Sequence, residues 1–224
     1  MHIVIRASSC LLLWVMVTAG WASELGGQGP LRLIPAGQLV SILPAGTVIL
    51  EASSVIERFL TELDDVPPDW SAVYGNGHHA PGLDDRLFEL NRARDAKREG
   101  RPALSQHISF VWSGELSPYR EDLGGFPVAL GPRHIKTSWG MTRFKPEDAP
   151  GNLSLTTDAV RREQFSRQLR NGQSIEIDVV MTGTLIPQES ILYDFSHDEE
   201  GLGLIMPFVR IERVDFVERP LSSH

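Results

Sequence analysis

Cysteine is almost absent from this chain of 224 residues, and the single copy, Cys10, lies close to the start. It opens an apolar run that ends at Val17, between the cation Arg6 and small residues that end at Ala22. A basic start, a short apolar core and a small-residue cleavage site are typical of a secretory signal peptide. We therefore expect residues 1–22 to be removed on export. The remaining chain would hold no cysteine, which excludes disulfides, thiolate catalysis and cysteine-bound zinc.

Long hydrophobic stretches are also scarce. A membrane-spanning helix needs about 20 apolar residues. The run over residues 10–17 reaches that length only if its polar and small flanks are included, so an uncleaved anchor is the alternative to a cleaved signal. No later stretch is long and apolar enough to span a bilayer. We expect a periplasmic or secreted protein of a bacterial envelope, with no integral membrane span once the signal is removed.

Positive charge is in short supply, because the formal net charge is −8. Nucleic-acid binding depends on basic surfaces that contact phosphates, so this balance argues against a nucleic-acid partner. The glycine-rich phosphate and dinucleotide motifs are missing, and so is the Gly-x-Ser-x-Gly motif of serine hydrolases. The sequence therefore predicts no catalytic residue and no organic cofactor.

The patterns that are present divide the rest of the chain into two regions. Residues 23–50 are interrupted by glycines and prolines and predict an exposed lead-in, with one short strand over 39–43. Residues 51–220 predict a single globular domain, because a chain of this length can bury an ordinary hydrophobic core. A helical part covers residues 51–104 of this domain, and a β-rich part covers residues 105–220.

Two helices are expected in the helical part. The first begins at Ser53 or Ser54, and its apolar residues recur at helical spacing: Val55, Ile56, Phe59, Leu60 and Leu63. Its charged residues are expected to face away from the core: Glu57, Arg58, Glu62 and Asp64. The second helix runs from about Asp84 to Glu99, with a charged outer face from Arg92 onward. Its inward residues are expected to be Leu83, Leu87, Leu90 and Ala93.

From residue 106 onward the pattern alternates as in β-strands. Three alternating runs cover Ile108–Trp112, Ile135–Arg143 and Ile175–Met181. Two more strands are expected over 191–195 and 202–217, the second broken near Pro207. One inserted helix, from Asp158 to Arg170, would bury Val160, Phe165 and Leu169. The expected fold class is α+β: a mainly antiparallel β-sandwich or barrel with two N-terminal helices and one inserted helix.

A short internal similarity lies within the β-rich part. Residues 108–118 align without a gap with residues 177–187, and both follow the pattern Ile-x-x-Val-x-[Ser/Thr]-Gly-x-Leu-x-Pro. Glycine permits a sharp bend or bulge in a strand, and proline ends pairing on one side. One interpretation is two related β units, over 106–146 and 175–220, that pack as a pseudo-symmetric sandwich or barrel. The other is that two strands of one sheet use the same bend independently.

One cluster of residues could bind a divalent metal ion. His78 and His79 lie in a glycine-rich loop, and Asp84 follows them. Imidazole and carboxylate groups bind zinc and similar ions, although the side chains of adjacent histidines usually diverge. The alternative is a solvated turn in which an aspartate caps the second helix. A bound metal would favour an extracytoplasmic metal-assisted hydrolase.

The other candidate site is a binding surface in the first β unit. Four aromatic residues and one arginine gather near a long polar loop over residues 117–125: Trp112, Tyr119, Arg120, Phe126 and Trp139. Aromatic rings can line a groove for a partner, although most of them belong to the core. Polar loops on a rigid scaffold often carry function. The leading hypothesis is therefore a non-enzymatic, exported binding or envelope-assembly protein, whose partner is an unidentified protein or envelope component.

Overall fold

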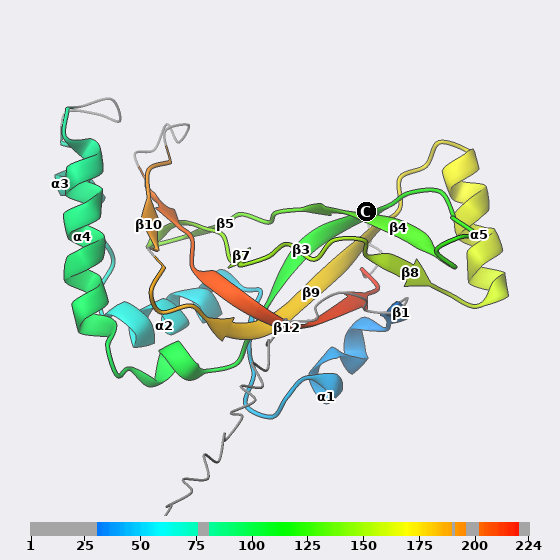
Figure 1. Ribbon diagram of the computed structural model, residues 1–224, viewed down its shortest axis with the longest axis horizontal. Helices are drawn as coiled ribbons and strands as arrows, with labels where there is room; N and C mark the ends of the chain where they lie inside the picture. Colours follow the sequence, from blue (N-terminus) through cyan, green and yellow to red (C-terminus); the bar gives the residue numbers. More distant parts are fainter. Residues whose placement is uncertain (1–30, 76–80, 190, 196–201, 220–224) are drawn as a thin grey trace, which may run out of the picture.

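The computed structural model describes residues 31–75, 81–189, 191–195 and 202–219 (Figure 1). The signal peptide predicted over residues 1–22 lies outside these ranges. The fold is α+β, with a closed six-stranded barrel, additional short strands and helices at both ends. Among the helices of the described ranges, none combines the length and the apolar character needed to cross a bilayer.

Six strands close into a barrel at the centre of the molecule (Figure 1). In order around the barrel they are β1 (Leu31–Ile34), β8 (Ser154–Thr156), β4 (Phe126–Gly131), β3 (Ile108–Leu116), β9 (Glu176–Leu185) and β12 (Phe208–Val217). β1 closes the ring by pairing in parallel with β8 and β12, whereas the other pairs are antiparallel. Two short strands extend the sheet: β2 (Val48–Leu50) beside β3, and β7 (Lys145–Pro146) beside β12.

The alternation predicted for β3 and β9 sorts their side chains onto two faces. Ile108, Phe110 and Trp112 of β3 belong to the main core, together with Val179 and Met181 of β9. The intervening Val111 and Val180 belong to a separate small cluster with Leu39 of α1 (Leu39–Ile42). The helix α1 therefore covers a second apolar surface of this strand pair.

The lead-in expected over residues 23–50 is part of the fold from residue 31 onward. β1 and β2 both pair with barrel strands. The prediction of a strand over 39–43 was wrong, because the chain forms α1 there, directly after a 3₁₀ turn, η1 (Ala36–Gln38). Short apolar runs do not distinguish a strand from a buried helix. Here the apolar surface offered by Val111 and Val180 favours a helical turn that places Leu39 against them.

The two copies of the internal similarity pair with each other in the barrel. Val111 of β3 faces Val180 of β9, and these two valines are themselves matched positions of the alignment. On either side, matched positions exchange places, so that Ile108 faces Gly183 and Gly114 faces Ile177. This register is that of a local two-fold axis through the valine pair.

The chain also leaves the two copies in the same way. The backbone N–H of Ser117, just after β3, donates to the carbonyl oxygen of Pro127 at 2.8 Å. The backbone N–H of Ile186, the matched position after β9, donates to the carbonyl oxygen of Phe208 at 3.0 Å. The segments that follow β3 and β9 therefore start at equivalent places at opposite ends of the strand pair.

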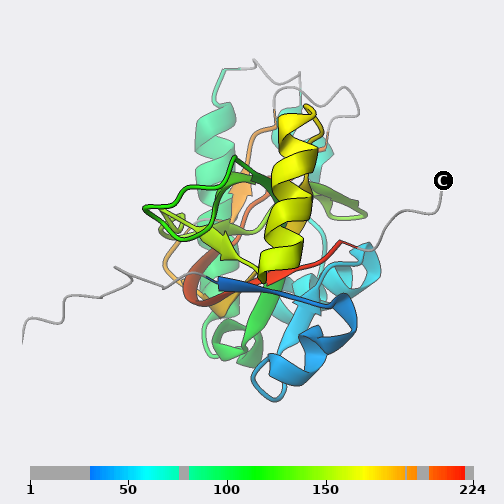
Figure 2. The same ribbon diagram turned by 90° about the vertical axis from the view of Figure 1, so that its right-hand side faces the viewer.

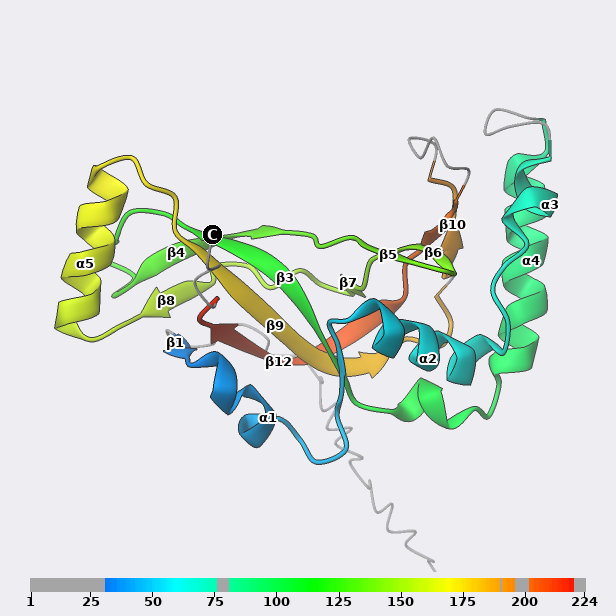
Figure 3. The same cartoon turned by 180° about the vertical axis from the view of Figure 1, so that it is seen from behind.

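These two ends carry different structures (Figures 1 and 3). One end holds the helical lobe, which consists of three helices and a four-stranded sheet. Its helices are α2 (Ser53–Asp64), α3 (Trp70–Tyr74) and α4 (Leu83–Arg98), and a 3₁₀ turn, η2 (Pro102–Ser105), leads back to the barrel. Its sheet has the order β10 (Leu192–Tyr193), β11 (Leu204–Ile205), β6 (Gly140–Thr142) and β5 (Ile135–Thr137). The other end holds α5 (Ala159–Arg170), which Figure 2 shows in front of the barrel.

One run of the β-rich part was predicted wrongly as a single strand. Residues 135–143 form the hairpin of β5 and β6, with Trp139 in its turn. The hydroxyl of Thr137 donates to the carbonyl oxygen of Gly140 at 2.8 Å, and Gly140 has a φ of 138°. Because L-residues rarely adopt such an angle, the glycine allows the turn that the alternating pattern concealed.

Two buried side chains connect the helices of the lobe to its sheet. Trp70 Nε1 donates to the Trp139 carbonyl oxygen at 2.6 Å, and a Cβ at Gly203 would lie only 2.0 Å from the Trp70 ring. Asn91 of α4 accepts from the backbone N–H groups of Ile191 (3.1 Å) and Leu192 (2.9 Å) and donates to the Leu192 carbonyl oxygen (2.8 Å). Asn91 thus makes the hydrogen bonds that a neighbouring strand would make beside β10.

A buried ion-pair network joins α2 to α4. Arg98 donates to both carboxylate oxygens of Asp64, at 2.7 and 2.6 Å, and Arg94 donates to one of them at 2.9 Å. The expectation that Asp64 and the charged residues from Arg92 onward face solvent was therefore wrong for Asp64, Arg94 and Arg98, which are buried. Burial is tolerated because each charge has an opposite partner.

Two apolar residues that were expected inside their helices are exposed. Ala93 of α4 is exposed, and Val160 in the first turn of α5 has 80% of its surface exposed. α5 is instead held to the barrel by Phe165, which is buried, and Leu169, which is half-buried. The apolar stripe of α5 is therefore narrower than its sequence indicates, and most of the helix surface faces solvent.

Candidate functional site

A groove runs between α5 and the loop that follows β3. We call it the α5 groove; it has a volume of about 450 Å³ and is lined by Pro118, Tyr119, Glu121, Arg162, Glu163, Ser166, Leu169 and Arg170. Asp158 fixes the start of α5, because its Oδ1 accepts from the backbone N–H of Arg161 at 2.8 Å. Asn171 and Gly172 end the helix, and Gly172 has a φ of 75°.

Tyr119 forms one wall of the groove, and aromatic packing fixes its position. Its ring packs edge-to-face with the Phe126 ring, with centroids 5.2 Å apart, and Phe126 packs in the same way with Phe165 of α5 at 5.8 Å. Both phenylalanines are buried. Edge-to-face pairs of this kind favour one ring orientation. The same three rings therefore hold the loop and α5 together and hold Tyr119 in place at the surface.

Arg162 covers Tyr119 from the helix side. Its guanidinium lies 5.2 Å from the centre of the Tyr119 ring and donates to the phenol oxygen at 3.4 Å. The hydrogen bond to Tyr119 raises the pKa of Arg162 above its usual value. Arg162 is thus a permanent cation whose flat side chain forms part of the groove wall.

The charges of the groove balance one another. Arg170 pairs with Glu163 at 3.1 Å, and both side chains are mostly exposed. Glu121 and Arg162 contribute one further charge of each sign to the lining. Pro118, Tyr119 and Leu169 supply the apolar part. A groove with an apolar wall and a neutral, polar rim suits a ligand with the mixed character of a peptide segment.

The loop itself is closed by local contacts. Arg120 and Gly125 exchange backbone hydrogen bonds of 2.9 and 3.3 Å. A Cβ at Gly125 would lie 2.7 Å from the Leu155 carbonyl oxygen, so only glycine lets the loop approach β8 this closely. The Arg120 side chain bonds to Asp122 at 3.0 Å and lowers the pKa of that carboxyl group. Arg120, although predicted as a binding residue, does not line the groove.

The five residues predicted for the binding surface therefore have different positions. Tyr119 lines the groove, and Phe126 supports it from the core. Trp112 is buried and donates from Nε1 to the Phe144 carbonyl oxygen at 2.9 Å. Trp139 is buried in the helical lobe. The structure thus brings together Tyr119 and Phe126, whereas neither tryptophan lines the groove.

The predicted metal site cannot be assembled from the residues that the structure describes. Asp84 is exposed in the first turn of α4, and the residue that caps this helix is Gly82. His78 and His79 lie outside the described ranges. Within those ranges, no group of three or more histidine, cysteine, aspartate or glutamate residues is placed to hold a metal ion. Metal binding at His78, His79 and Asp84 stays a prediction.

Sequence reasoning missed the half of the groove that α5 supplies. Arg162, Ser166 and Arg170 recur at intervals of four residues, which places them on one face of a helix. That spacing was a usable signal. It could not show that this face lies against residues 118–121, because the two segments are about 40 residues apart in the chain.

No protein-family model matches the chain, and neither a curated protein nor a solved structure does.

Proposed function

We propose that the protein is an exported, non-enzymatic binding protein that holds a segment of a partner protein in the α5 groove. The observation that carries this proposal is the placement of Tyr119, which lies at the surface and packs edge-to-face on buried phenylalanine rings. A preorganised aromatic wall lowers the entropy cost of binding, and tyrosine is frequent at such contacts.

The shape and charge of the groove support a peptide segment as the ligand. Its volume of about 450 Å³ can accommodate one or two side chains of a partner. The apolar wall suits an aliphatic or aromatic side chain, and Ser166, Glu121 and the N–H groups of Arg162 can bond to the adjacent backbone. The neutral rim selects against a strongly charged ligand.

A displayed library of random heptapeptides, fused through their C-termini, tests the proposal directly. Peptides enriched on the purified protein are synthesised, and their affinities are measured by calorimetry. Tyr119→Ala and Arg162→Ala should each weaken binding about tenfold or more, as expected for wall residues of a small site. Arg167→Ala is the matched control, because Arg167 is an exposed arginine of the same helix that does not line the groove.

The proposal is wrong if the enriched peptides bind all three variants as tightly as the original protein. It is equally wrong if no peptide is enriched over a surface without the protein. Circular dichroism of each variant shows whether a loss of affinity reflects a loss of fold.

We also infer that residues 106–146 and 175–220 are two related β units. The register of β3 and β9 supports this, because matched residues exchange places about the Val111–Val180 pair. The equivalent hydrogen bonds of Ser117 and Ile186, two further matched positions, support it as well, because they are backbone geometry and do not depend on residue type. On this proposal the α5 groove and the helical lobe are different additions to the same strand unit.

A further inference from the structure

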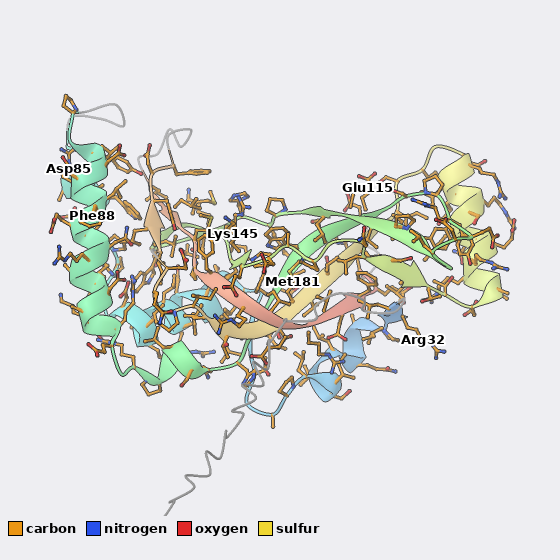
Figure 4. All side chains as sticks on the ribbon, in the orientation of Figure 1. Arg32, Asp85, Phe88, Glu115, Lys145 and Met181 are labelled. Atoms are coloured by element: carbon orange, nitrogen blue, oxygen red, sulfur yellow. The ribbon has the colours of Figure 1, made fainter. Side chains whose placement is uncertain are left out.

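A second cavity lies at the other flank of α5, where β1 passes the start of the helix. We call it the β1 cavity; it has a volume of about 360 Å³ and is lined by Arg32, Leu33, Thr156, Thr157, Asp158 and Arg161. It shares no lining residue with the α5 groove. Figure 4 shows Arg32 on β1, at the end of the molecule that carries α5.

Two arginines from separate elements line this cavity. Arg32 comes from β1 and is exposed; no residue of the described ranges forms an ion pair or side-chain hydrogen bond with it. Arg161 comes from the first turn of α5, and within the described part of the chain its one ion pair is with Glu218, at 3.5 Å; both of these side chains are partly exposed. Exposed pairs of this kind contribute little stability, so a ligand can replace Glu218 at low cost.

The remaining polar side chains of the cavity can accept hydrogen bonds from a ligand. The hydroxyl of Thr156 donates to the Leu31 carbonyl oxygen at 3.3 Å, and that of Thr157 donates to the Asp158 carbonyl oxygen at 3.2 Å, so their lone pairs remain for a donor. Asp158 caps α5 through Oδ1 alone. Because this cap already satisfies the helix, the cavity does not depend on the N-terminus of α5 as an anion site.

Two cations beside a carboxylate match a ligand that is anionic at one point and a hydrogen-bond donor nearby. The last residue of a polypeptide has this arrangement, because its α-carboxylate lies two bonds from its own backbone N–H. Arginine binds carboxylates through paired hydrogen bonds. Capture of a free chain end is also a recurring mode of peptide recognition.

We propose that the β1 cavity binds the free C-terminal residue of a polypeptide, with Arg32 and Arg161 on the carboxylate and Asp158 on the backbone N–H. Leu33 contributes the apolar contact for the terminal side chain. This site goes beyond the α5 groove and does not require it. The displayed heptapeptides used to test the groove have no free C-terminus, so they cannot occupy this cavity.

Pairs of N-acetylated tripeptides that differ only in a C-terminal carboxylate or carboxamide test the proposal. Each is titrated into the ¹⁵N-labelled full chain and followed by NMR. The free acids should move the backbone signals of Thr157 and Arg161 in a saturable manner, and the amides should bind about tenfold or more weakly, as expected for loss of hydrogen bonds to a charged group. Arg32→Ala and Arg161→Ala should each weaken binding of the free acid by a similar factor. Arg167→Ala should leave this affinity unchanged.

Further arms exclude other anions and the other site. The acetylated peptides should bind more tightly than the corresponding free amino acids, acetate or inorganic phosphate, and Tyr119→Ala should leave their affinity unchanged. Equal binding of acid and amide, tighter binding of phosphate or of the free amino acid, or no saturable shift at Thr157 and Arg161 would each overturn the proposal. Because Arg32 is exposed, its loss should not unfold the protein, and the melting temperature of Arg32→Ala checks this.

Discussion

The two ends of the barrel use polar side chains in opposite ways. In the helical lobe, Asp64 and Asn91 are buried and bonded to groups of other elements. At the α5 end, Arg162, Glu163 and Arg170 are exposed; the hydrogen bond of Arg162 to Tyr119 is long, at 3.4 Å, and the pair of Arg170 with Glu163 is open to solvent. Buried networks specify one structure, whereas exposed groups on a rigid support remain accessible to a partner. This contrast agrees with our proposal that a partner binds at the α5 end, and it leads us to expect the lobe to contribute more to stability.

The largest expected effect comes from breaking the buried ion pairs of the lobe. Asp64→Ala removes the carboxylate that pairs with both arginines; among the described residues, Arg94 is then buried without an ion-pair partner and Arg98 keeps only Asp95. The substitution should lower the free energy of unfolding by about 3–5 kcal/mol. Asp122→Ala is the control at the α5 end; its pair with Arg120 is exposed to solvent, so its loss should change the free energy of unfolding far less. Urea unfolding of both variants measures the difference. Equal losses would remove the distinction between the two ends.

The two matched glycines, Gly114 and Gly183, allow the two strands β3 and β9 to be compared with each other. A Cβ at Gly183 would lie 1.9 Å from the Arg210 carbonyl oxygen, whereas a Cβ at Gly114 would meet the Val179 side chain at 2.7 Å. Side chains can move more easily than the backbone of a paired strand. Gly114→Ala should therefore lower the free energy of unfolding by about 1–3 kcal/mol. Gly183→Ala should lower it by more. Urea unfolding that ranks them in the opposite order would contradict this account of β9.

Asn91 provides a smaller test of the lobe. Asn91→Ala leaves backbone groups of Ile191 and Leu192 without partners and should lower the free energy of unfolding by about 1–3 kcal/mol. Hydrogen exchange at the amides of these two residues should become faster. The neighbouring Arg92 is exposed, and Arg92→Ala should change stability by about 0.5 kcal/mol or less. Unchanged exchange in Asn91→Ala would show that β10 does not need the asparagine.

The smallest expected effect is the response of the two ends to acid. Hydrogen bonds from the Ser138 backbone, Arg101 and Ser71 lower the pKa of Glu57, Asp65 and Asp69 respectively, all in the lobe. A carboxyl group with a lower pKa in the folded state stabilises the fold above its ordinary pKa, and this contribution is lost as the pH falls through the folded-state value. The contribution of these lobe residues to the free energy of unfolding should therefore decrease once the pH falls below the ordinary pKa values of 4.5 for Glu and 3.8 for Asp.

Unfolding at a series of pH values, with and without Glu57→Gln, Asp65→Asn and Asp69→Asn together, measures this effect. The triple variant should show a shallower loss of stability on acidification than the original chain. Asp122, at the α5 end, also has a lowered pKa, and Asp122→Asn serves as the single-site comparison. A triple variant with an unchanged pH dependence would contradict the assignment to the lobe.

Sequence patterns predict the strand pair well because its signals are local. The alternation at Ile108, Phe110 and Trp112 and the matched glycines depend only on neighbouring residues, and the barrel uses both. Patterns failed where a distant partner decides the outcome. Asp64 is a surface residue by type, and it is buried because arginines from another helix, 30 and 34 residues along the chain, reach it.

The candidate site shows the same limit. The polar loop and Tyr119 could be identified from residue type and spacing. The same criteria also selected three aromatic residues that belong to the core: Trp112, Trp139 and Phe126. Burial of a ring depends on which element covers it, and no local pattern specifies that α5 packs on Phe126 through Phe165. The β1 cavity requires Arg32 and Arg161, about 130 residues apart, and only the closed ring of strands places them together.

We propose that the α5 end binds the partner and that the helical lobe contributes stability. An NMR titration of the ¹⁵N-labelled chain with a peptide selected on the α5 groove tests it most directly. We predict signal changes confined to residues 117–125 and α5, with the amides of α2, α3 and α4 unmoved, and loss of those changes in Tyr119→Ala. Changes centred on the helical lobe, or changes that persist in Tyr119→Ala, would contradict the claim.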